Sequence, residues 1–472
     1  MSLTKASYSM INGAPVNVRD FGATGDGVTD DTAAIQAAVN SGAWDVYAPA
    51  GNYLLSASIE IKTPIYFHGA GRNGTIFKQN TNFDVFVIDD GVGVMSGMSM
   101  AKFQIINTQA AASVTSGAGI RMYRSYYGVF DDILISNCYF GVRSRQSNVT
   151  RYNAVDVFFV YVGYLFSEGF SFDSYIANCV ISGQGGGFSS VYMLDMCDEL
   201  TFYSVIMNRS AYNVYADASA YGVNLRPEFC RFTSCSFDSS STGVFLRHTT
   251  DMSFTNCFFS NRPGNGIQIG TTSTVENTVF QGCTFFNNGG SGAVVGQYAD
   301  NTIFDNCNFV GNSTTVSNAG NGITVSANAL NFTITNSVFK NGWGSSGSQN
   351  YGIAIGSGSS NGFVITNNNF GASGTGSILN QASGTNIHIA NNIGFVSKNS
   401  GEATILTGNS SVVVTHGLGG QPLSKDITLT PALLPTVAVY VSALAPTTFT
   451  ISAAAPVAVD TRINWIATIA GN

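Results

Sequence analysis

Hydrophobic and polar positions along the chain follow one repeating phrase. An aromatic residue or Ile is followed three positions later by Cys or a substitute, and two positions after that by Phe. The clearest copies are FTSCSF (Phe232–Phe237), FTNCFF (Phe254–Phe259), FQGCTF (Phe280–Phe285) and FDNCNF (Phe304–Phe309). Weaker copies place the central position at 138, 155, 179, 205, 337, 368 and 392. The ten intervals between 138 and 392 give a mean period of about 25 residues.

A short alternating segment that begins with Gly precedes several copies of the phrase. Examples are GVFL at Gly243, GIQI at Gly266, GITV at Gly322 and GIAI at Gly352. Strands of about 4–6 residues, each rising about 3.3 Å per residue, fill one period three times over once turns are added. The pattern therefore predicts a coil of three short strands and three turns, stacked on its neighbours as a parallel β-helix of about eleven or more coils.

The residue just before the central position is Asn in seven copies and Gly, Ser or Ala in the other four. These residues are Asn137, Ala154, Asn178, Ser204, Ser234, Asn256, Gly282, Asn306, Asn336, Asn367 and Asn391. Asn and Gly tolerate the left-handed backbone conformation that a one-residue corner requires. We therefore expect a ladder of asparagines along one edge of the stack.

Six of the eight cysteines occupy the central position of the phrase. They are Cys138, Cys179, Cys235, Cys257, Cys283 and Cys307. Equivalent positions hold Val, Ser or Asn, which indicates a small buried side chain and not a reactive thiol. The paired Cys-x-x-Cys spacing of a zinc site is missing, so we expect neither a metal nor a cofactor.

Near the N-terminus, a Gly-rich turn leads into a short amphipathic helix. In the segment VNVRDFGATGDGVTDDTAAIQAAVNSG (Val16–Gly42), Asp30 or Asp31 serves as N-cap and Gly42 ends the helix. Such a helix can close the open end of a stacked core. The motif DFGATGDGVTDDTAAIQAA resembles the opening of the pectate-lyase-like superfamily of right-handed parallel β-helices, and specifically of bacteriophage tailspikes. With the coils, the resemblance covers roughly residues 16–398.

After residue 398 the pattern changes to short alternating strands separated by Gly and Pro, which predicts a small β-sandwich. We expect three parts: an N-terminal segment with the capping helix (1–45), the parallel β-helix (46–398) and the C-terminal sandwich (399–472). The sandwich is similar to C-terminal modules of tailspikes, which implies trimerisation or sugar contact. The chain before the helix is short, so we expect the particle-binding domain of such spikes to be missing or separate.

Composition limits the possible partners. The chain has 472 residues with 20 basic and 27 acidic ones and a net charge of −7, which argues against a nucleic-acid partner. No run of 18 apolar residues and no signal-peptide pattern is present at Met1–Gly13, so we expect no membrane insertion and synthesis in a host cytoplasm. Residues 121–300 contain ten arginines and no lysine. Arginine suits polyanionic or uronic sugars because its planar fork binds carboxylates and hydroxyls, although turn capping explains part of this set.

In each Gly-led strand, the residues between the two inward hydrophobic ones point outward. The outward pairs are Arg121 and Tyr123, Arg143 and Arg145, Leu165 and Ser167, Tyr192 and Leu194, Asn224 and Arg226, and Phe245 and Arg247. The candidate substrate-binding residues are Tyr123, Arg143, Arg145, Tyr192, Arg226, Phe245, Arg247, His248 and Asp251. The arginines would orient a sugar, and the aromatic residues could stack on its rings.

Acidic residues follow these strands in four consecutive coils, namely Glu168, Asp195, Glu228 and Asp251, and the first three are the candidate catalytic groups. Glu168, Asp195 and Glu228 are our candidates; Asp195 is followed by Asp198 and Glu199. Consecutive coils lie about 4.8 Å apart, so neighbouring acids could match the roughly 5–5.5 Å of a retaining glycosidase. Acids two coils apart could match the wider separation of an inverting one. Either way, one carboxyl would protonate the glycosidic oxygen.

The resemblance implies a homotrimeric phage tailspike that binds and depolymerises a bacterial capsule, O-antigen or exopolysaccharide, usually by endo-glycosidic hydrolysis. It also implies a virion protein joined to the phage tail or baseplate. A polysaccharide lyase is the runner-up, with His248 as base beside Arg247 and Asp251. A non-catalytic receptor-binding fibre is the third reading.

Overall fold

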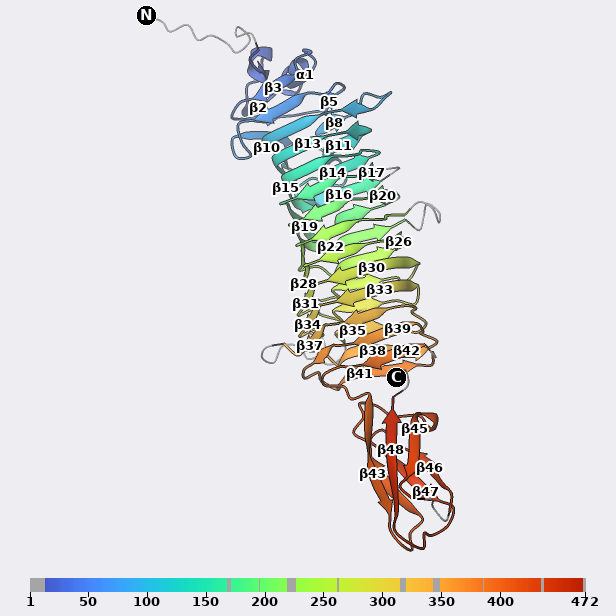
Figure 1. Ribbon diagram of the computed structural model, residues 1–472. Coiled ribbons are helices and arrows are strands. Elements are labelled where there is room, and N and C mark those ends of the chain that lie inside the picture. Colours follow the sequence, from blue (N-terminus) through green and yellow to red (C-terminus); the bar gives the residue numbers. More distant parts are fainter. Residues whose placement is uncertain are drawn as a thin grey trace, which may run out of the picture. The chain divides into compact units, whose positions relative to one another are not determined.

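The computed structural model describes residues 13–167, 171–194, 196–218, 226–260, 263–314, 320–342, 349–384, 386–433 and 437–469. The chain divides into two compact units, Met1–Val279 and Phe280–Asn472. Most strands are parallel, and each pairs with the equivalent strand of the next coil (Figure 1). The result is a parallel β-solenoid of about 13 turns with about 26 residues per turn, which confirms the predicted fold and period.

Three parallel sheets, A, B and C, form the sides of the first unit. Sheet A contains β5 (Ile59–Ile61), β8 (Phe86–Ile88), β11 (Ala118–Tyr123), β14 (Phe140–Arg145), β16 (Val162–Ser167), the ends of β19 (Val180–Met193) and β22 (Ile206–Asp217), β25 (Thr242–Arg247) and β29 (Ile267–Ile269). Sheet B contains β1 (Val16–Asn17), β3 (Asp45–Ala48), β6 (Tyr66–Gly69), the beginnings of β10 (Ser99–Asn107), β13 (Val129–Ser136) and β15 (Arg151–Val160), then β18 (Tyr175–Ala177), β21 (Thr201–Tyr203), β23 (Arg231–Thr233), β27 (Ser253–Thr255) and β30 (Val275–Gln281). Sheet C contains β2 (Asp26–Asp30), β4 (Gly51–Leu54), β7 (Thr75–Gln79), the ends of β10, β13 and β15, the beginnings of β19 and β22, β24 (Ser236–Asp238) and β28 (Phe258–Ser260). Short strands join the sheets: β9 (Met95–Ser96), β12 (Ser125–Tyr126), β17 (Ser171–Phe172), β20 (Cys197–Asp198) and β26 (Thr249–Thr250).

The second unit repeats the same pairing. One ladder contains β32 (Ala293–Val295), β35 (Ile323–Val325), β38 (Tyr351–Gly358) and β41 (Gly376–Ala382). The next contains β33 (Ala299–Asp305), β36 (Thr333–Thr335), β39 (Phe363–Thr366) and β42 (Ile387–Ala390). The third contains β31 (Thr284–Phe286), β34 (Asn308–Val310), β37 (Val338–Lys340) and β40 (Asn369–Phe370).

The left-handed corners agree with the sequence pattern, with one correction. All eleven residues predicted to turn the chain have positive φ, from 50° at Ala154 to 65° at Gly282. Ten of them follow a strand of sheet B or, in the second unit, a strand of the ladder that contains β33, β36, β39 and β42. Asn137 instead follows the end of β13, which belongs to sheet C. Val155 pairs with Ile133 and not with Cys138, so Asn137 and Cys138 lie one corner later in their coil. The phrase recurs at both corners because each needs a left-handed residue followed by an inward one.

The core is filled by columns of identical side chains from successive coils. In the first unit, the ring of Phe232 stacks between those of Phe202 and Phe254, at 4.6 and 4.9 Å between centroids. In the second, Phe309 stacks between Phe285 and Phe339 at 4.6 and 4.8 Å. All eight cysteines are buried and none forms a disulfide, as expected for small core residues. Stacking follows from the period, because each coil places the same residue type at the same position.

One arginine ties neighbouring coils together on the outside of the first unit. The Arg72 guanidinium donates from Nε to Asp132 at 2.7 Å, from Nη1 to Asp156 at 2.6 Å, and from Nη2 to the Ala154 carbonyl at 2.6 Å. Asp132 and Ala154 both have positive φ, so the contact fastens two consecutive left-handed corners. Arginine suits this position because its planar fork can serve three acceptors at once.

The N-terminal motif forms the expected helix, and its two aspartates, Asp30 and Asp31, bind different backbone amides. A 3-10 turn, η2 (Val18–Phe21), precedes helix α1 (Thr32–Val39). Asp31 is the residue before α1, but its carboxylate accepts from the Thr24 and Gly25 amides at 2.6 and 3.1 Å. Asp30 instead accepts from the Thr32 amide at 3.0 Å. The paired aspartates therefore hold the Gly-rich turn and the helix start at the same time.

The C-terminal strands form two three-stranded antiparallel sheets, as the predicted small β-sandwich requires. One contains β43 (Lys398–Ile405), β48 (Thr461–Thr468) and β45 (Ile427–Pro431); the other contains β44 (Ser411–Thr415), β47 (Thr448–Ala453) and β46 (Val439–Leu444). Two further 3-10 turns are η3 (Ala111–Ser113) and η4 (Ser424–Asp426). Among the described residues, no helix is long and apolar enough to cross a membrane.

Candidate functional site

Sheet A carries most of the candidate binding residues on its outer side. The in-register columns on this side are Arg121, Arg143, Leu165, Tyr192, Tyr215 and Phe245, and beside them Tyr123, Arg145 and Ser167, continuing with Asp217 and Arg247. Val142 and Ser144, which alternate with Arg143 and Arg145 along β14, are buried, so the predicted alternation holds there. Leu165 and Ser167 are correctly placed in the columns, but they are 7% and 3% exposed because neighbouring side chains cover them.

Arginines dominate one end of this face. The Arg145 guanidinium lies 4.8 Å from the Tyr123 ring centre, and that of Arg124 lies 4.3 Å from the same ring. Arg143 lies 5.6 Å from the Phe140 ring centre. Arg124 also pairs with Asp89 at 3.8 Å, and Arg121 pairs with Asp84 at 3.2 Å. The ring contacts hold the guanidinium groups of Arg143 and Arg145 on this face, where they can meet an anionic ligand.

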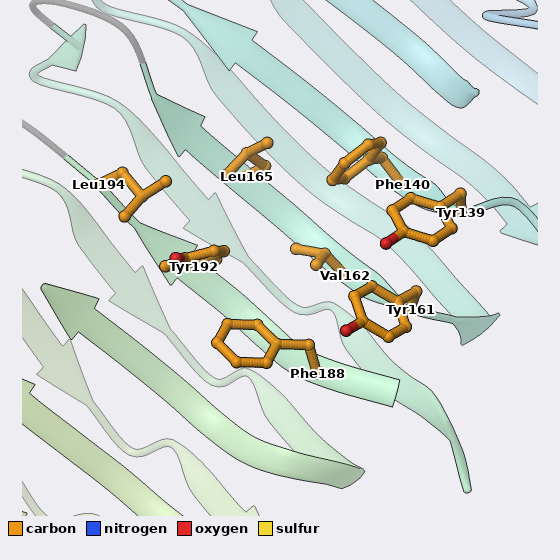
Figure 2. Close-up of a pocket in the computed structure, with 8 residues that line it drawn as sticks. All are labelled: Tyr139, Phe140, Tyr161, Val162, Leu165, Phe188, Tyr192 and Leu194. Atoms are coloured by element: carbon orange, nitrogen blue, oxygen red, sulfur yellow. The ribbon is translucent and has the colours of Figure 1, made fainter. Parts of the chain in front are cut away.

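Aromatic side chains dominate the middle of the face. The Tyr215 and Phe245 rings stack at 5.3 Å, and Tyr192 meets Tyr215 edge to face at 5.3 Å. Between the arginines and these rings lies a pocket of about 400 Å³, drawn in Figure 2. Its lining residues are Tyr139, Phe140, Tyr161, Val162, Leu165, Phe188, Tyr192 and Leu194. Rings arranged along a face in this way can stack against sugars.

Beyond the aromatic residues on the same face lies Arg247, which we expected to orient the substrate and which forms an ion pair. Arg247 pairs with Asp217 at 3.1 Å, and the Tyr215 hydroxyl donates to the Asp217 carboxylate at 3.1 Å. Burial raises the pKa of Tyr215, so its hydroxyl stays protonated as a donor. Arg247 therefore belongs to a preassembled polar cluster on two neighbouring coils.

The predicted outward pair Asn224 and Arg226 is wrong. The strand of sheet A in this coil is the end of β22, so Tyr215 and Asp217 hold the outward positions opposite Phe245 and Arg247. Asn224 lies outside the described residues. Arg226 follows the strand and pairs with Glu276 at 2.9 Å. The error arose because no Gly precedes the sheet A strand of this coil. Gly222 is followed by a similar alternating segment, so the outward positions were counted from Gly222.

Beside the Arg247 end of sheet A, short bridges between coils bring acidic residues into one column. Glu228 pairs in register with Asp198 of β20 on one side and with Thr250 of β26 on the other. Partial burial, followed by the negative charges of Glu228 and Glu199, raises the pKa of Asp198 to about 6. A carboxyl with this pKa is protonated in mildly acidic solution, as a general acid must be. Asp198 and Glu228 thus occupy paired backbone positions in adjacent coils, whose strands lie about 4.8 Å apart.

The other two predicted catalytic acids, Glu168 and Asp195, lie outside the described residues. His248 and Asp251 are both left-handed corner residues, with φ of 49° and 51°. The Asp251 carboxylate accepts from the Thr250 hydroxyl at 3.1 Å. Arg247, the third member of the predicted lyase set, is engaged by Asp217 on the preceding coil. The structure therefore gives the acid pair a clearer chemical arrangement than the lyase set.

Four residues of the candidate site were not among those predicted from the sequence. Asp198 appeared there only as a neighbour of Asp195, and Asp217, Tyr215 and Phe188 did not appear at all. The signal for Asp198 was its position next to Glu199, in the coil before Glu228. What distinguishes Asp198 is its register with Glu228, and that register depends on turn lengths in two coils. Tyr215 and Asp217 alternate in the sequence as outward residues should, and only the wrong choice of strand hid them.

Known proteins resemble the chain in both sequence and fold. A family model described as rhamnogalacturonase A/epimerase, pectate lyase-like, matches residues 15–268, and a model of the right-handed β-helix region matches residues 219–393. These matches confirm the right-handed, pectate-lyase-like β-helix.

Two enzymes resemble part of the chain in sequence, and a phage tailspike resembles it in fold. Mannuronan C5-epimerase AlgE5 of Azotobacter vinelandii is 47% identical over 79 residues, which are 14% of this chain and 8% of that protein. Alginate lyase 7 of the same organism is 44% identical over 79 residues, 14% of this chain and 9% of that protein. The chain thus spans less than a tenth of the length of these relatives. The Pseudomonas phage phi297 tailspike gp61 has a TM-score of 0.61 at 12% identity, covering 97% of this chain and 99% of that one.

Proposed function

The chain belongs to the rhamnogalacturonase A/epimerase family of pectate-lyase-like proteins, and on this basis we propose that it is a phage tailspike that binds and depolymerises a bacterial surface polysaccharide. The reaction is endo-glycosidic hydrolysis. The observation that carries this proposal is the pairing of Asp198, whose pKa is raised to about 6, with Glu228 on the next coil. The tailspike likeness in fold and the relationship to carbohydrate-acting enzymes support the class of substrate.

Asp198 and Glu228 divide the chemistry between them. Asp198 is the general acid: its carboxyl donates a proton to the glycosidic oxygen as the bond to the leaving sugar breaks. Glu228, charged and one coil away, attacks the sugar carbon or activates the water that does. A spacing of one coil, about 5 Å, matches the retaining geometry. Partial burial and then the negative charge of Glu228 raise the pKa of Asp198 to about 6, so that Asp198 is protonated in mildly acidic solution and the two carboxyls can take different roles.

The outer side of sheet A binds the polymer on either side of the bond that is cleaved. Arg143 and Arg145, with Tyr123, hold an acidic sugar or its hydroxyls at one end. Tyr192 and Phe245 stack against sugar rings in the middle. Arg226, placed by its ion pair with Glu276, and Arg247, placed by Asp217, orient the sugar beside the acids.

The setting of this activity also belongs to the proposal. The protein acts as a homotrimer on the virion, joined to the phage tail or baseplate, and meets its substrate at the bacterial surface. Residues 1–45 serve as the entry and cap of the helix, 46–398 as its catalytic body, and 399–472 as the trimerisation or sugar-contact module. Likeness to the phage phi297 tailspike supports the virion setting.

The test is incubation with a panel of purified capsules, O-antigens, exopolysaccharides and alginate. Hydrolysis gives shorter chains and new reducing ends without the ultraviolet absorbance of an unsaturated uronate. Asp198→Asn and Glu228→Gln should each abolish cleavage, whereas Asp238→Asn on sheet C should not. Shortening accompanied by that absorbance would establish the lyase and overturn hydrolysis. Binding of a polymer without shortening would overturn both and leave a receptor-binding fibre.

A further inference from the structure

The pocket on sheet A lies where β16 and β19 carry short side chains, Val162 and its in-register partner Ser189. Val162 of β16 lies in register with the larger Phe140 of β14, and Leu165 lies in register with Arg143 and Tyr192. Val162 is 2% exposed and forms the floor, with the longer side chains standing around it (Figure 2). The hollow is therefore built into the sequence of three consecutive coils.

The walls of this hollow are mainly carbon. Tyr139, Tyr161 and Phe188 occupy equivalent positions in the three coils. The ring centre of Tyr161 lies 4.6 Å from that of Tyr139 and 6.3 Å from that of Phe188. Leu165 and Leu194 close the opposite side. The polar atoms in the lining are the tyrosine hydroxyls. A sugar hydroxyl placed against such walls would lose hydrogen bonds to water without regaining them, whereas a methyl group would gain from leaving water.

We propose that this pocket recognises an apolar substituent on the glycan, namely the methyl group of an acetylated or 6-deoxy sugar. The inference rests on the proposed function, because it assigns the pocket to the same polymer. Continuity with the arginines supports this occupant. The Arg143 guanidinium lies 5.6 Å from the centre of the Phe140 ring, which forms one wall of the pocket. A sugar seated there places its substituent on Val162 and its charged or hydroxylated edge beside Arg143.

The expected preference follows from the burial of one methyl group. Removing one methyl-sized apolar group from water tightens binding about fourfold. Three matched pairs of free sugars serve as probes: L-rhamnose against L-mannose, N-acetyl-D-glucosamine against D-glucose, and 6-O-acetyl-D-glucose against D-glucose. Saturation-transfer NMR should show magnetisation reaching the methyl protons of at least one substituted sugar. Which pair responds distinguishes the deoxy, N-acetyl and O-acetyl sources of the methyl group.

Two variants locate the binding. Leu165→Phe fills the pocket with a ring and should abolish the methyl signal. Gln268→Phe adds the same ring at the next position of the same column beyond Phe245, outside the pocket, and should leave the signal unchanged. Circular dichroism and the melting temperature verify that both variants are folded. A methyl signal that survives in Leu165→Phe overturns the proposal.

Other outcomes also decide the question. Equal binding of substituted and unsubstituted sugars means that the pocket only stacks sugar rings, and it overturns recognition of a substituent. No binding of any probe, as expected if a second copy of the chain covers the pocket, overturns it too. The assay needs no cleavage, so Asp198→Asn should keep the methyl signal. If the wild-type chain binds methyl probes but cleaves no polymer, the proposed hydrolysis fails while the pocket assignment stands.

Discussion

The raised pKa of Asp198 offers a direct test of the acid pair. Glu199→Gln removes one of the negative charges that raise this pKa and leaves Asp198 and Glu228 unchanged. Glu199 is a corner residue with φ of 55°, and its backbone N–H donates to the Glu228 carbonyl at 3.1 Å. That bond does not involve the side chain, so glutamine should preserve the local fold. The variant therefore changes the charge around Asp198 and little else.

The magnitude follows from the titration of a single carboxyl. With a pKa of about 6, Asp198 is protonated in about 90% of molecules at pH 5, whereas an ordinary aspartate with a pKa of 3.8 would be protonated in about 6%. Burial is the largest cause of the shift, and Glu228 contributes before Glu199. Loss of the Glu199 charge at a partly exposed site should lower the pKa by about half a unit. The alkaline limb of the kcat profile should move to lower pH by the same amount.

The assay is the release of reducing ends from the cleaved polysaccharide, measured from about pH 4 to about pH 8 at saturating substrate. Asp238→Asn is the matched control, since it removes one carboxylate from β24 on sheet C. Its limb should coincide with that of the wild type. An unchanged limb in Glu199→Gln, or a shift to higher pH, would refute the role of Asp198 as general acid. Low salt strengthens the test because screening weakens the charge effect.

Three further predictions concern stability and substrate binding. Phe232→Ala removes a ring stacked on both sides and should lower the free energy of unfolding by about 3–5 kcal/mol, measured by urea denaturation, whereas the exposed Phe229→Ala should change it by less than about 0.5 kcal/mol. Similar losses in both would contradict the stacked core. Arg72→Met leaves two aspartates and a carbonyl without their shared donor. Because the arginine is only a quarter exposed, the substitution should lower the free energy of unfolding by about 1–3 kcal/mol, measured in the same way. No change would mean that the contact is only a surface ion pair. Arg145→Gln should raise KM about tenfold with kcat unchanged, and a fall in kcat alone would remove it from substrate binding.

The period of the chain was enough to predict the stacked coils, because a solenoid repeats its local pattern. Each coil must turn at fixed points, so asparagines and glycines recur there, and each must fill the same core position, so phenylalanines and cysteines recur as well. Asn137 shows the limit of this reasoning. Its phrase matches the others, yet it turns a different corner, since two corners of one coil have the same local requirement.

The candidate site was predictable only where the coil kept its regular length. The outward residues Arg143, Arg145, Tyr192 and Phe245 follow from simple alternation along strands, and they lie as expected. Arg226 was misplaced because its coil has no regular Gly-led strand start, so counting from Gly222 chose the wrong strand. Alternation within a strand is local, but the number of residues between strands is not.

The sequence by itself determined the architecture: the β-helix, its period, its buried columns and the arginine-rich stretch all follow from residues that repeat at short range. The tertiary structure decided which residues of different coils meet. The register of Asp198 with Glu228, the ion pair of Arg247 with Asp217, and the hollow over Val162 each join residues from separate coils. These contacts depend on which strand of one coil pairs with which strand of the next, and the number of residues between strands varies from coil to coil, so local alternation alone does not reveal them.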